Sequence, residues 1–146
     1  MNNVEKSKLV IRSLVDQDIE PAISIWWSDI SPKEIINAEI RGPNNMSLVA
    51  EYEGILVGFV IARSVYIGLP MVGVCLMHVM AVRNDYQQQG IGTALINQLR
   101  NNCCDKNIKI IRAPVPEGNE RLKKYVEDLG FHPSDTIEYD RLCSDE

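Results

Sequence analysis

Residues 72–100 have the sequence VGVCLMHVMAVRNDYQQQGIGTALINQLR, and this stretch organises the rest of the chain. The apolar run Val72–Val82 predicts a strand, the polar residues Arg83–Gln89 predict a turn, and apolar residues at helical spacing predict a helix over Gly90–Asn102. A Gly-Ile-Gly sequence opens this helix. Small residues there leave backbone N–H groups accessible to an anion at the positive end of the helix. The stretch therefore indicates a phosphate site, or a tight turn without a ligand.

Composition places the chain among ordinary soluble globular proteins. Its 146 residues, 45% hydrophobic and 24% charged, predict a single domain over residues 1–146 that buries roughly two-thirds of its unfolded surface. The net charge of -5, with no dense cluster of Lys and Arg, argues against a nucleic-acid partner. An acidic surface suits a cationic substrate slightly better than an anionic one.

The cysteines indicate neither a metal site nor a disulfide framework. No pair has C-x-x-C spacing, and no histidine lies at ligand spacing from them. We expect reduced thiols in a cytoplasmic protein, with the first cysteine packed as a small apolar side chain and the adjacent pair at a helix end. The four are Cys75, Cys103, Cys104 and Cys143.

Neither a secretory signal nor a membrane anchor is expected. The first ten residues, MNNVEKSKLV, contain no apolar segment of the kind that signal peptides require. The longest apolar run, Leu69–Val82, falls short of the ~20 residues that span a bilayer. It contains Gly73 and His78, so we interpret it as a buried strand.

The front of the chain predicts one strand and two helices. Leu9–Ser13 is a short apolar strand, and Asp16 or Asp18 can cap the helix that follows. Ser31-Pro32 starts a second short helix that ends at Gly42-Pro43. The two helices would form a flap over one end of a sheet. Their apolar positions are Ile19, Ile23, Trp26, Trp27 and Ile30 in the first helix, and Ile35, Ile36 and Ile40 in the second.

Two further strands and a hairpin follow. Met46–Tyr52 and Ile55–Ser64 are strand-like runs, and Glu53-Gly54 between them is a tight hairpin signal. Tyr66–Pro70 is expected to be a loop that leads into the strand Val72–Val82.

The last third predicts a strand, a helix and a final strand. Ile108–Ala113 is a fully buried strand by composition, and the preceding helix makes it parallel to Val72–Val82. Asn119 caps a helix that runs to about Leu129, where Gly130 can end it in the left-handed conformation. Thr136–Leu142 is expected to be the last strand. This order predicts an α+β (mixed α/β) domain with an antiparallel front half and one parallel pair.

Two familiar phosphate-binding motifs do not fit the glycine pair. A Walker loop needs Lys after its last glycine, which this chain lacks. A dinucleotide fingerprint needs a third glycine where Leu95 stands and an acidic residue after the next strand, which ends Arg112-Ala113-Pro114.

A longer pattern is more specific. The strand end Met80-Ala81-Val82, a turn containing Tyr86, and Gln87-x-x-Gly90-x-Gly92 opening a helix resemble the acetyl-CoA signature of the GCN5-related N-acetyltransferase (GNAT) superfamily. The segment NERLKKYVEDLGF, residues 119–131, resembles that superfamily's second motif, an Asn-capped helix closing on Gly-Phe. The resemblance covers most of the chain from Leu9 onwards.

The resemblance implies the acyl-CoA N-acyltransferase fold and an acetyl-CoA site. The central sheet would splay between the strands 72–82 and 108–113, with helices on its flanks. The pyrophosphate would bind backbone N–H groups, and the pantetheine arm would pair with the strand edge, as an extended amide ligand does at an open edge. The implied cofactor-binding residues are Met80, Ala81, Val82, Gln87, Gln88, Gln89, Gly90, Ile91, Gly92 and Thr93, with Asn119 as either a ligand or only a helix cap.

Acetyl transfer to an amine depends more on a base than on an acid. A lysine-like ammonium with a pKa of ~10.4 costs roughly 4.6 kcal/mol to deprotonate at pH 7, whereas a leaving thiol with a pKa of about 8.5 needs only ~2 kcal/mol. His78 is the candidate base, because it precedes the pantetheine strand end by a few residues and histidine titrates near neutrality. Leu76 replaces the first of two histidines seen in similar arylalkylamine N-acetyltransferases. The alternative is a hydrogen-bonded core histidine.

The general acid is where the chain departs from the family pattern. Val126 stands four residues before the closing Gly130, where the family has tyrosine. Tyr125 precedes it by one position, which rotates its side chain ~100° around the helix. Tyr125 is therefore either a displaced acid or an aromatic core residue.

Two functions remain open on the sequence. The first is an N-acetyltransferase that moves an acetyl group from acetyl-CoA to a primary amine of a small molecule or protein by direct attack. The second is an acyl-CoA-binding regulatory or interaction module with little turnover. Neither needs a metal, a membrane or a nucleic acid, and a homodimer is compatible with both. Trp26 or Trp27 could line an acceptor pocket, and Arg83 or Arg100 could meet a CoA phosphate.

Overall fold

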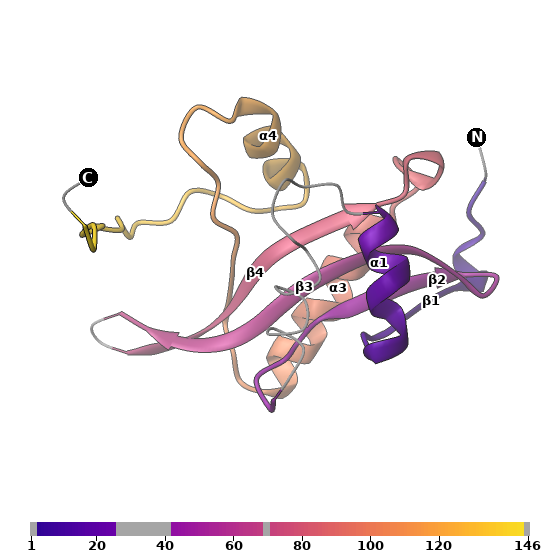
Figure 1. The fold of residues 1–146 in the computed structure, drawn as a ribbon, viewed down its shortest axis with the longest axis horizontal. Coiled ribbons are helices and arrows are strands. Elements are labelled where there is room, and N and C mark those ends of the chain that lie inside the picture. Colours follow the sequence, from indigo (N-terminus) through magenta and orange to yellow (C-terminus); the bar gives the residue numbers. More distant parts are fainter. Residues whose placement is uncertain (1–2, 26–41, 69–70, 145–146) are drawn as a thin grey trace. The chain divides into compact units, whose positions relative to one another are not determined.

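The computed structural model describes residues 3–25, 42–68 and 71–144, which form two compact units, Met1–Pro114 and Val115–Glu146. Figure 1 shows the described chain as a ribbon. The predicted second front helix and both tryptophans lie outside the described residues.

The first unit is built on a five-stranded mixed sheet whose spatial order follows the sequence. Neighbouring strands are antiparallel except for the last two, which are parallel. This confirms the predicted antiparallel front half with one parallel pair. The strands are β1 (Leu9–Ser13), β2 (Leu48–Tyr52), β3 (Ile55–Ile67), β4 (Val72–Val82) and β5 (Ile110–Arg112).

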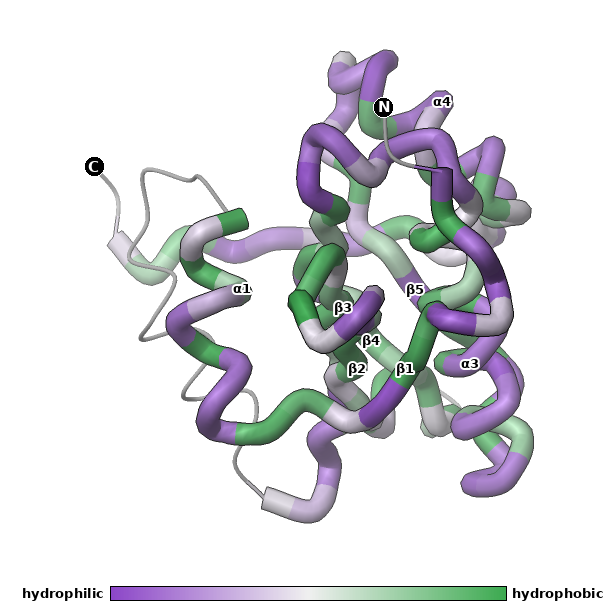
Figure 2. Tube along the Cα trace, turned by 90° about the vertical axis from the view of Figure 1, so that its right-hand side faces the viewer, coloured by the Kyte–Doolittle hydropathy of each residue, from purple (hydrophilic) through white to green (hydrophobic). Residues whose placement is uncertain are grey.

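Two helices cover opposite faces of this sheet, as the two views show (Figures 1 and 2). Helix α1 (Ile19–Ile25) packs on β3, and helix α3 (Ile91–Asp105) packs across β2, β3 and β4. Apolar residues concentrate in the strands between the helices, coloured green in Figure 2. The core on the α1 face contains Leu14, Ile19, Ala22, Val49, Leu56, Phe59 and Ile61. The buried residues of α3 are Ile91, Leu95, Ile96, Leu99 and Cys103.

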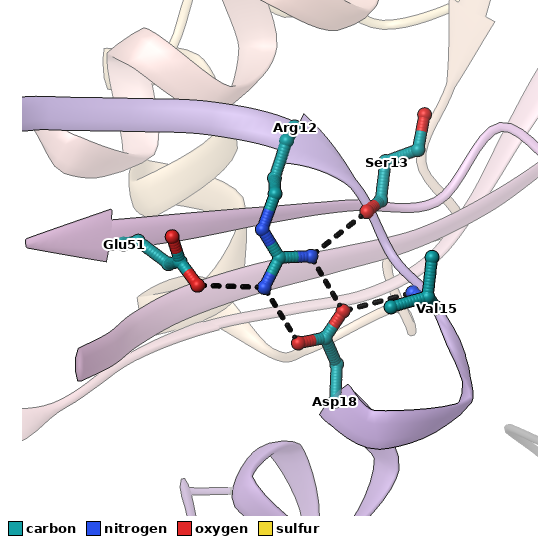
Figure 3. A network of polar contacts seen from close by, with 5 residues as sticks. All are labelled: Arg12, Ser13, Val15, Asp18 and Glu51. Carbon is teal, nitrogen blue, oxygen red and sulfur yellow. Dashed lines mark hydrogen bonds and ion pairs between the residues drawn. The ribbon is translucent and has the colours of Figure 1, made fainter. Parts of the chain in front are cut away.

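The start of α1 is tied to the sheet by an ionic network (Figure 3). Arg12 of β1 donates through both terminal nitrogens to the carboxylate of Asp18, at 2.7 and 2.8 Å, and also to Glu51 of β2 at 2.7 Å. The backbone N–H of Val15 donates to the same Asp18 carboxylate at 2.8 Å. Burial pushes the pKa of Asp18 upward, but the Arg12 hydrogen bonds, the Val15 N–H and the Arg12 charge outweigh it, so this pKa lies below its usual range.

Backbone conformation explains the tight hairpin between β2 and β3. Glu53 and Gly54 both have positive φ, 52° and 81°. A two-residue hairpin of this kind matches the right-handed twist of the strands, as the Glu-Gly pair predicted.

The second unit contains helix α4 (Glu120–Asp128). The side chain of Asn119 accepts from the backbone N–H of Leu122 at 3.1 Å, which confirms the predicted cap. After the helix, Gly130 has a φ of 98°, and the N–H of Phe131 donates to the carbonyl of Val126 at 3.0 Å. These bonds satisfy carbonyls at the helix end, as expected for a glycine stop.

Several predicted boundaries differ from the structure. β3 continues to Ile67, so Tyr66 and Ile67 are not in a loop, because β4 is long enough to pair with them. Helix α3 begins at Ile91 with Gly90 as its N-cap and runs to Asp105 rather than Asn102.

The predicted strand over Ile108–Ala113 is present and parallel to β4, but the prediction was wrong about its length and its full burial. Only Ile110–Arg112 form β5, and Ile110 is 40% exposed. The strand is paired on one side only among the described residues, so its outer edge and part of its face lie open.

The predicted final strand was also wrong. Thr136–Leu142 form no helix or strand, and Ile137 and Tyr139 are 77% and 92% exposed. A strand needs a ladder partner, and alternating apolar residues alone do not supply one.

Candidate active site

The turn after β4 is braced by its own polar groups. The N–H of Arg83 donates to the carbonyl of Val57 at 2.8 Å. Val57 is the extra residue at the point where the register of β3 against β2 shifts by one. The side chain of Gln87 donates to the carbonyl of Val82 at 3.0 Å and to the side chain of Asn84 at 3.2 Å. Gln87 therefore holds the turn closed with its side chain.

Six consecutive backbone N–H groups follow without a protein acceptor in the described part of the chain. The first helical bond of α3 runs from the N–H of Ala94 to the carbonyl of Gly90 at 2.9 Å, so the N–H groups of Gln88–Thr93 remain available. Gln88 and Gly90 both have positive φ, 61° and 84°. Alternating left-handed residues before a helix make a concave set of N–H groups that suits an anion.

Gly58 of β3 allows the helix to start where it does. A Cβ at this position would lie 3.2 Å from the carbonyl oxygen of Ala81 and 3.2 Å from the Ile91 side chain. The glycine therefore lets the first turn of α3 pack directly on the end of β4. Gly58 was not among the residues predicted for the site, although a glycine inside an apolar strand is a signal of close approach.

Among the strands that the structure describes, β4 has no partner on one side over the residues just before the turn. Its parallel pairing with β5 covers only Val74–Leu76, while its antiparallel pairing with β3 continues to Val82. Alternate N–H and C=O groups of Met77–Val82 point away from β3 toward this unpaired edge. The predicted splay between the two strands is thus present.

His78 occupies a β-bulge beside this edge. The register of β4 against β3 shifts by one residue between Ile61 and Ala62. Val79 and Met77 are paired across this step, so His78 between them is the extra residue. Its side chain is exposed, which excludes the core-histidine alternative.

The second unit carries the two other predicted site residues, Asn119 and Tyr125. Asn119 uses its side chain for the helix cap. Tyr125 is 41% exposed, and the partial burial of its ring raises the pKa of its phenol above the usual range. Val126, where the family tyrosine is expected, is buried.

The two candidate arginines lie differently with respect to the turn. Arg83 stands over the ring of Tyr86, 5.9 Å from its centroid, and pairs with Asp85 at 3.7 Å. Arg100 is exposed and lies roughly 13 Å further along the helix axis than Ile91. Arg83 is therefore the better placed of the two for a phosphate at the turn.

Comparison with protein families identifies the fold and its class of chemistry. Residues 12–131 match the family model described as the acetyltransferase (GNAT) family. The chain belongs to this family. No curated protein matches the sequence.

Three solved structures illustrate the similarity. The aminoglycoside N-acetyltransferase AAC(6')-Iy, in complex with the bisubstrate analogue CoA-S-monomethyl-acetylneamine, is 17% identical, with a TM-score of 0.75 over 92% of this chain and 99% of that one. A possible acetyltransferase from Clostridium difficile 630 is 17% identical, with a TM-score of 0.80 over 93% and 98%. A ribosomal-protein-alanine N-acetyltransferase from Brucella melitensis biovar Abortus 2308 is 18% identical, with a TM-score of 0.70 over 93% and 99%. At these identities the similarity shows the shared fold.

Two absences apply to the described part of this GNAT chain. Within it, no group of three or more His, Cys, Asp or Glu side chains could hold a metal ion. Of the helices in the described residues, none has both the length and the apolar character needed to cross a bilayer.

Proposed function

We propose that the protein is an N-acetyltransferase that moves an acetyl group from acetyl-CoA to a primary amine by direct attack. The observation that carries this proposal is the run of six N–H groups at Gln88–Thr93 that have no acceptor among the described residues, next to the edge of β4 that β5 leaves unpaired. One feature suits a pyrophosphate and the other suits an extended chain with amides.

The residues of the turn fit the phosphate end of CoA. The N–H groups of Gln88, Gln89, Gly90, Ile91, Gly92 and Thr93 would donate to the pyrophosphate, with the positive end of the α3 dipole behind them. Gln87 would act indirectly, since its side chain is engaged with Val82 and Asn84.

The residues of β4 fit the pantetheine arm. Met80, Ala81 and Val82 are paired with β3 on one side only, so their outward N–H and C=O groups could pair with the ligand's amides. When bound, the thioester supplies an acyl carbon that an amine can attack.

His78 is the proposed base. It lies two to four residues before the Met80–Val82 edge, roughly 7–13 Å along the strand. Because an ammonium costs roughly 4.6 kcal/mol to deprotonate at pH 7, a nearby imidazole that accepts its proton contributes most of the help that the reaction needs.

Tyr125 is the proposed acid for the leaving thiolate. A phenol with its ordinary pKa of ~10 is already protonated at neutral pH, as a proton donor must be, and the raised pKa of Tyr125 does not change this. The thiolate needs only ~2 kcal/mol of help, so turnover can persist if this residue is not in reach. The buried Val126 at the expected tyrosine position favours the second candidate function, an acyl-CoA-binding module with little turnover.

The acceptor class is tested with both kinds of amine suggested by the structural neighbours. One neighbour is named for acting on aminoglycosides and another for acting on ribosomal protein alanine. The net charge of -5 suits a polycationic amine.

A cytoplasmic location forms part of this proposal and is supported by four free cysteines.

The experiment is release of the CoA thiol from acetyl-CoA with a panel of amino sugars, arylalkylamines, polyamines and peptides with free N-termini. The proposal predicts amine-dependent thiol release with at least one class of acceptor, and acetylated product in equal amount. Binding of acetyl-CoA without release by any amine would instead favour the binding module.

A further inference from the structure

The N-terminal segment contacts the same turn that is proposed to bind phosphate. The backbone N–H of Val4 donates to the side-chain oxygen of Gln89 at 3.5 Å. The N–H of Glu5 donates to the hydroxyl of Tyr52 at 3.2 Å, and this hydroxyl donates to the carbonyl of Asn3 at 3.3 Å. Three consecutive residues, Asn3–Glu5, therefore make polar contacts at this end of the sheet.

Tyr52 connects these contacts to the front of the turn. Its ring lies 6.0 Å from that of Tyr86, tilted by 60°, and both residues are buried. Tyr86 closes the short helix η3 (Asn84–Tyr86), with its N–H donating to the carbonyl of Arg83 at 2.9 Å. The N-terminal segment thus contacts the turn directly at Gln89 and is connected to Tyr86 only through the ring of Tyr52.

The first half of the turn is braced by Gln87, but the half from Gln88 onward has less internal support. Gln88 holds a positive φ of 61°, which a non-glycine residue adopts at a cost, and the N–H groups beside it have no protein acceptor among the described residues. Ordering each residue of the turn costs backbone conformational entropy. Contacts that order the turn before the ligand arrives remove that cost from binding.

We infer that Asn3–Glu5 form a strap that positions the phosphate-binding turn, with Tyr52 and Gln89 as its positioning residues, so that acyl-CoA affinity depends on the N-terminus of the chain. This inference rests on the proposed function for the identity of the ligand. The contacts of the strap lie at the cofactor end of the site, with Gln89 and Tyr52, whereas the proposed base, His78, lies within β4.

A second set of N-terminal contacts does not carry this role. Lys8 pairs with Glu5 at 3.5 Å and with Glu53 at 3.4 Å. The hydrogen bonds that Lys8 donates to Glu53 and then to Glu5 raise the pKa of Lys8, but all three side chains are exposed, and exposed pairs contribute little. Lys8→Gln is therefore a matched control at the same end of the sheet.

The test compares Tyr52→Phe and a chain shortened to begin at Glu5 with Lys8→Gln and Tyr66→Phe. Tyr66 is 75% exposed and serves as a control for the loss of a tyrosine hydroxyl. The readouts are the Kd for CoA, the KM and kcat for acetyl-CoA turnover, and hydrogen exchange of the turn N–H groups without ligand. The exchange measurement needs no activity.

We expect Tyr52→Phe to raise Kd and KM by about threefold to tenfold, as the loss of one or two hydrogen bonds implies, with kcat unchanged. Exchange at Gln88–Thr93 should accelerate while exchange at Leu95–Leu99 in the middle of α3 stays constant. Both controls should match the unaltered protein. If the shortened chain does not fold, Tyr52→Phe alone tests the inference. This variant removes only the hydroxyl and keeps the ring that packs against Tyr86.

The inference is overturned if Kd and turn exchange in Tyr52→Phe stay within about twofold of the unaltered protein. Hydrogen exchange that accelerates evenly over the whole sheet would also overturn the inference, since that result indicates general destabilisation of the fold. If the unaltered protein binds no CoA, the proposed function fails, and the exchange data still decide whether the strap orders the turn.

Discussion

Gly90, at the start of α3, and Gly54, in the β2–β3 hairpin, both have a left-handed backbone, with φ of 84° and 81°. A Cβ added at either position would meet no atom within 4 Å. Alanine at each should cost about 1–2 kcal/mol of stability through the left-handed backbone alone. At Gly90 the substitution also alters the N-cap of α3, so we expect CoA affinity to fall as well. Urea unfolding and CoA titration of Gly90→Ala and Gly54→Ala measure the two effects separately.

Gly54→Ala is the control in that pair, because its turn lies in the β2–β3 hairpin. It should lose stability and keep its affinity for CoA. Equal affinity in both variants would show that the backbone at Gly90 is not part of the cofactor site.

Replacement of His78 by glutamine tests the proposed base. His78→Gln keeps a polar side chain at the exposed bulge but cannot accept a proton from an ammonium, so kcat at neutral pH should fall about 100-fold or more. Raising the pH should recover part of the loss as the amine deprotonates by itself. The measurement is the pH profile of amine-dependent CoA release.

His132 provides the matched control, since it is the other histidine of the chain and is also exposed. His132→Gln should keep its activity at every pH. Full activity of His78→Gln at neutral pH would rule out the proposed base.

Individual site residues were only partly predictable from the sequence. The Gln87-x-x-Gly90-x-Gly92 spacing indicated the turn, where Gly90 has the left-handed backbone that favours glycine. The exposure of His78 was not predictable, because it depends on a register shift between β3 and β4 that no local pattern reveals. The side-chain role of Gln89 depends on Val4, which is distant in sequence.

At the scale of elements, the Arg12–Asp18–Glu51 network determines how firmly α1 is held on the sheet. Asp18 is 5% exposed, so Asp18→Asn leaves a half-buried Arg12 with one partner fewer and should cost about 1–3 kcal/mol. Asp16→Asn, at an exposed neighbour, should cost little. Urea unfolding at pH 7 compares the two variants.

The same network predicts how stability depends on pH. The folded pKa of Asp18 is lowered, so its contribution is present above the unfolded pKa of ~3.9 and is lost as the pH falls through the folded value. The free energy of unfolding should therefore fall less steeply below pH ~4 in Asp18→Asn than in the unaltered protein. If the free energy of unfolding falls equally steeply with decreasing pH in the two proteins, Asp18 does not make this contribution to stability.

Elements with local signals were predicted well, and elements that depend on partners were not. The β2–β3 hairpin follows from Glu53-Gly54, and α4 follows from its Asn119 cap and Gly130 stop. β5 and the segment Thr136–Leu142 were overpredicted, because the sequence shows apolar residues but not which edges of a sheet are paired.

For the whole molecule, the sequence predicts one domain over residues 1–146, while the folded chain divides into two compact units, Met1–Pro114 and Val115–Glu146. We expect a single cooperative thermal transition, with calorimetric and van't Hoff enthalpies that agree. Acetyl-CoA should raise its midpoint, because a ligand that binds only the folded chain stabilises it. Two separate transitions would instead show that the two units are independent domains.

The most direct test of the central claim is an amide NMR titration of the full chain with CoA. The structure predicts the largest shifts at the unpaired N–H groups of Gln88–Thr93, with smaller shifts at Met80–Val82, and little change in the β2–β3 hairpin. Saturating CoA that leaves Gln88–Thr93 unchanged, whether it shifts other residues or none, would contradict the assignment of this turn as the cofactor site.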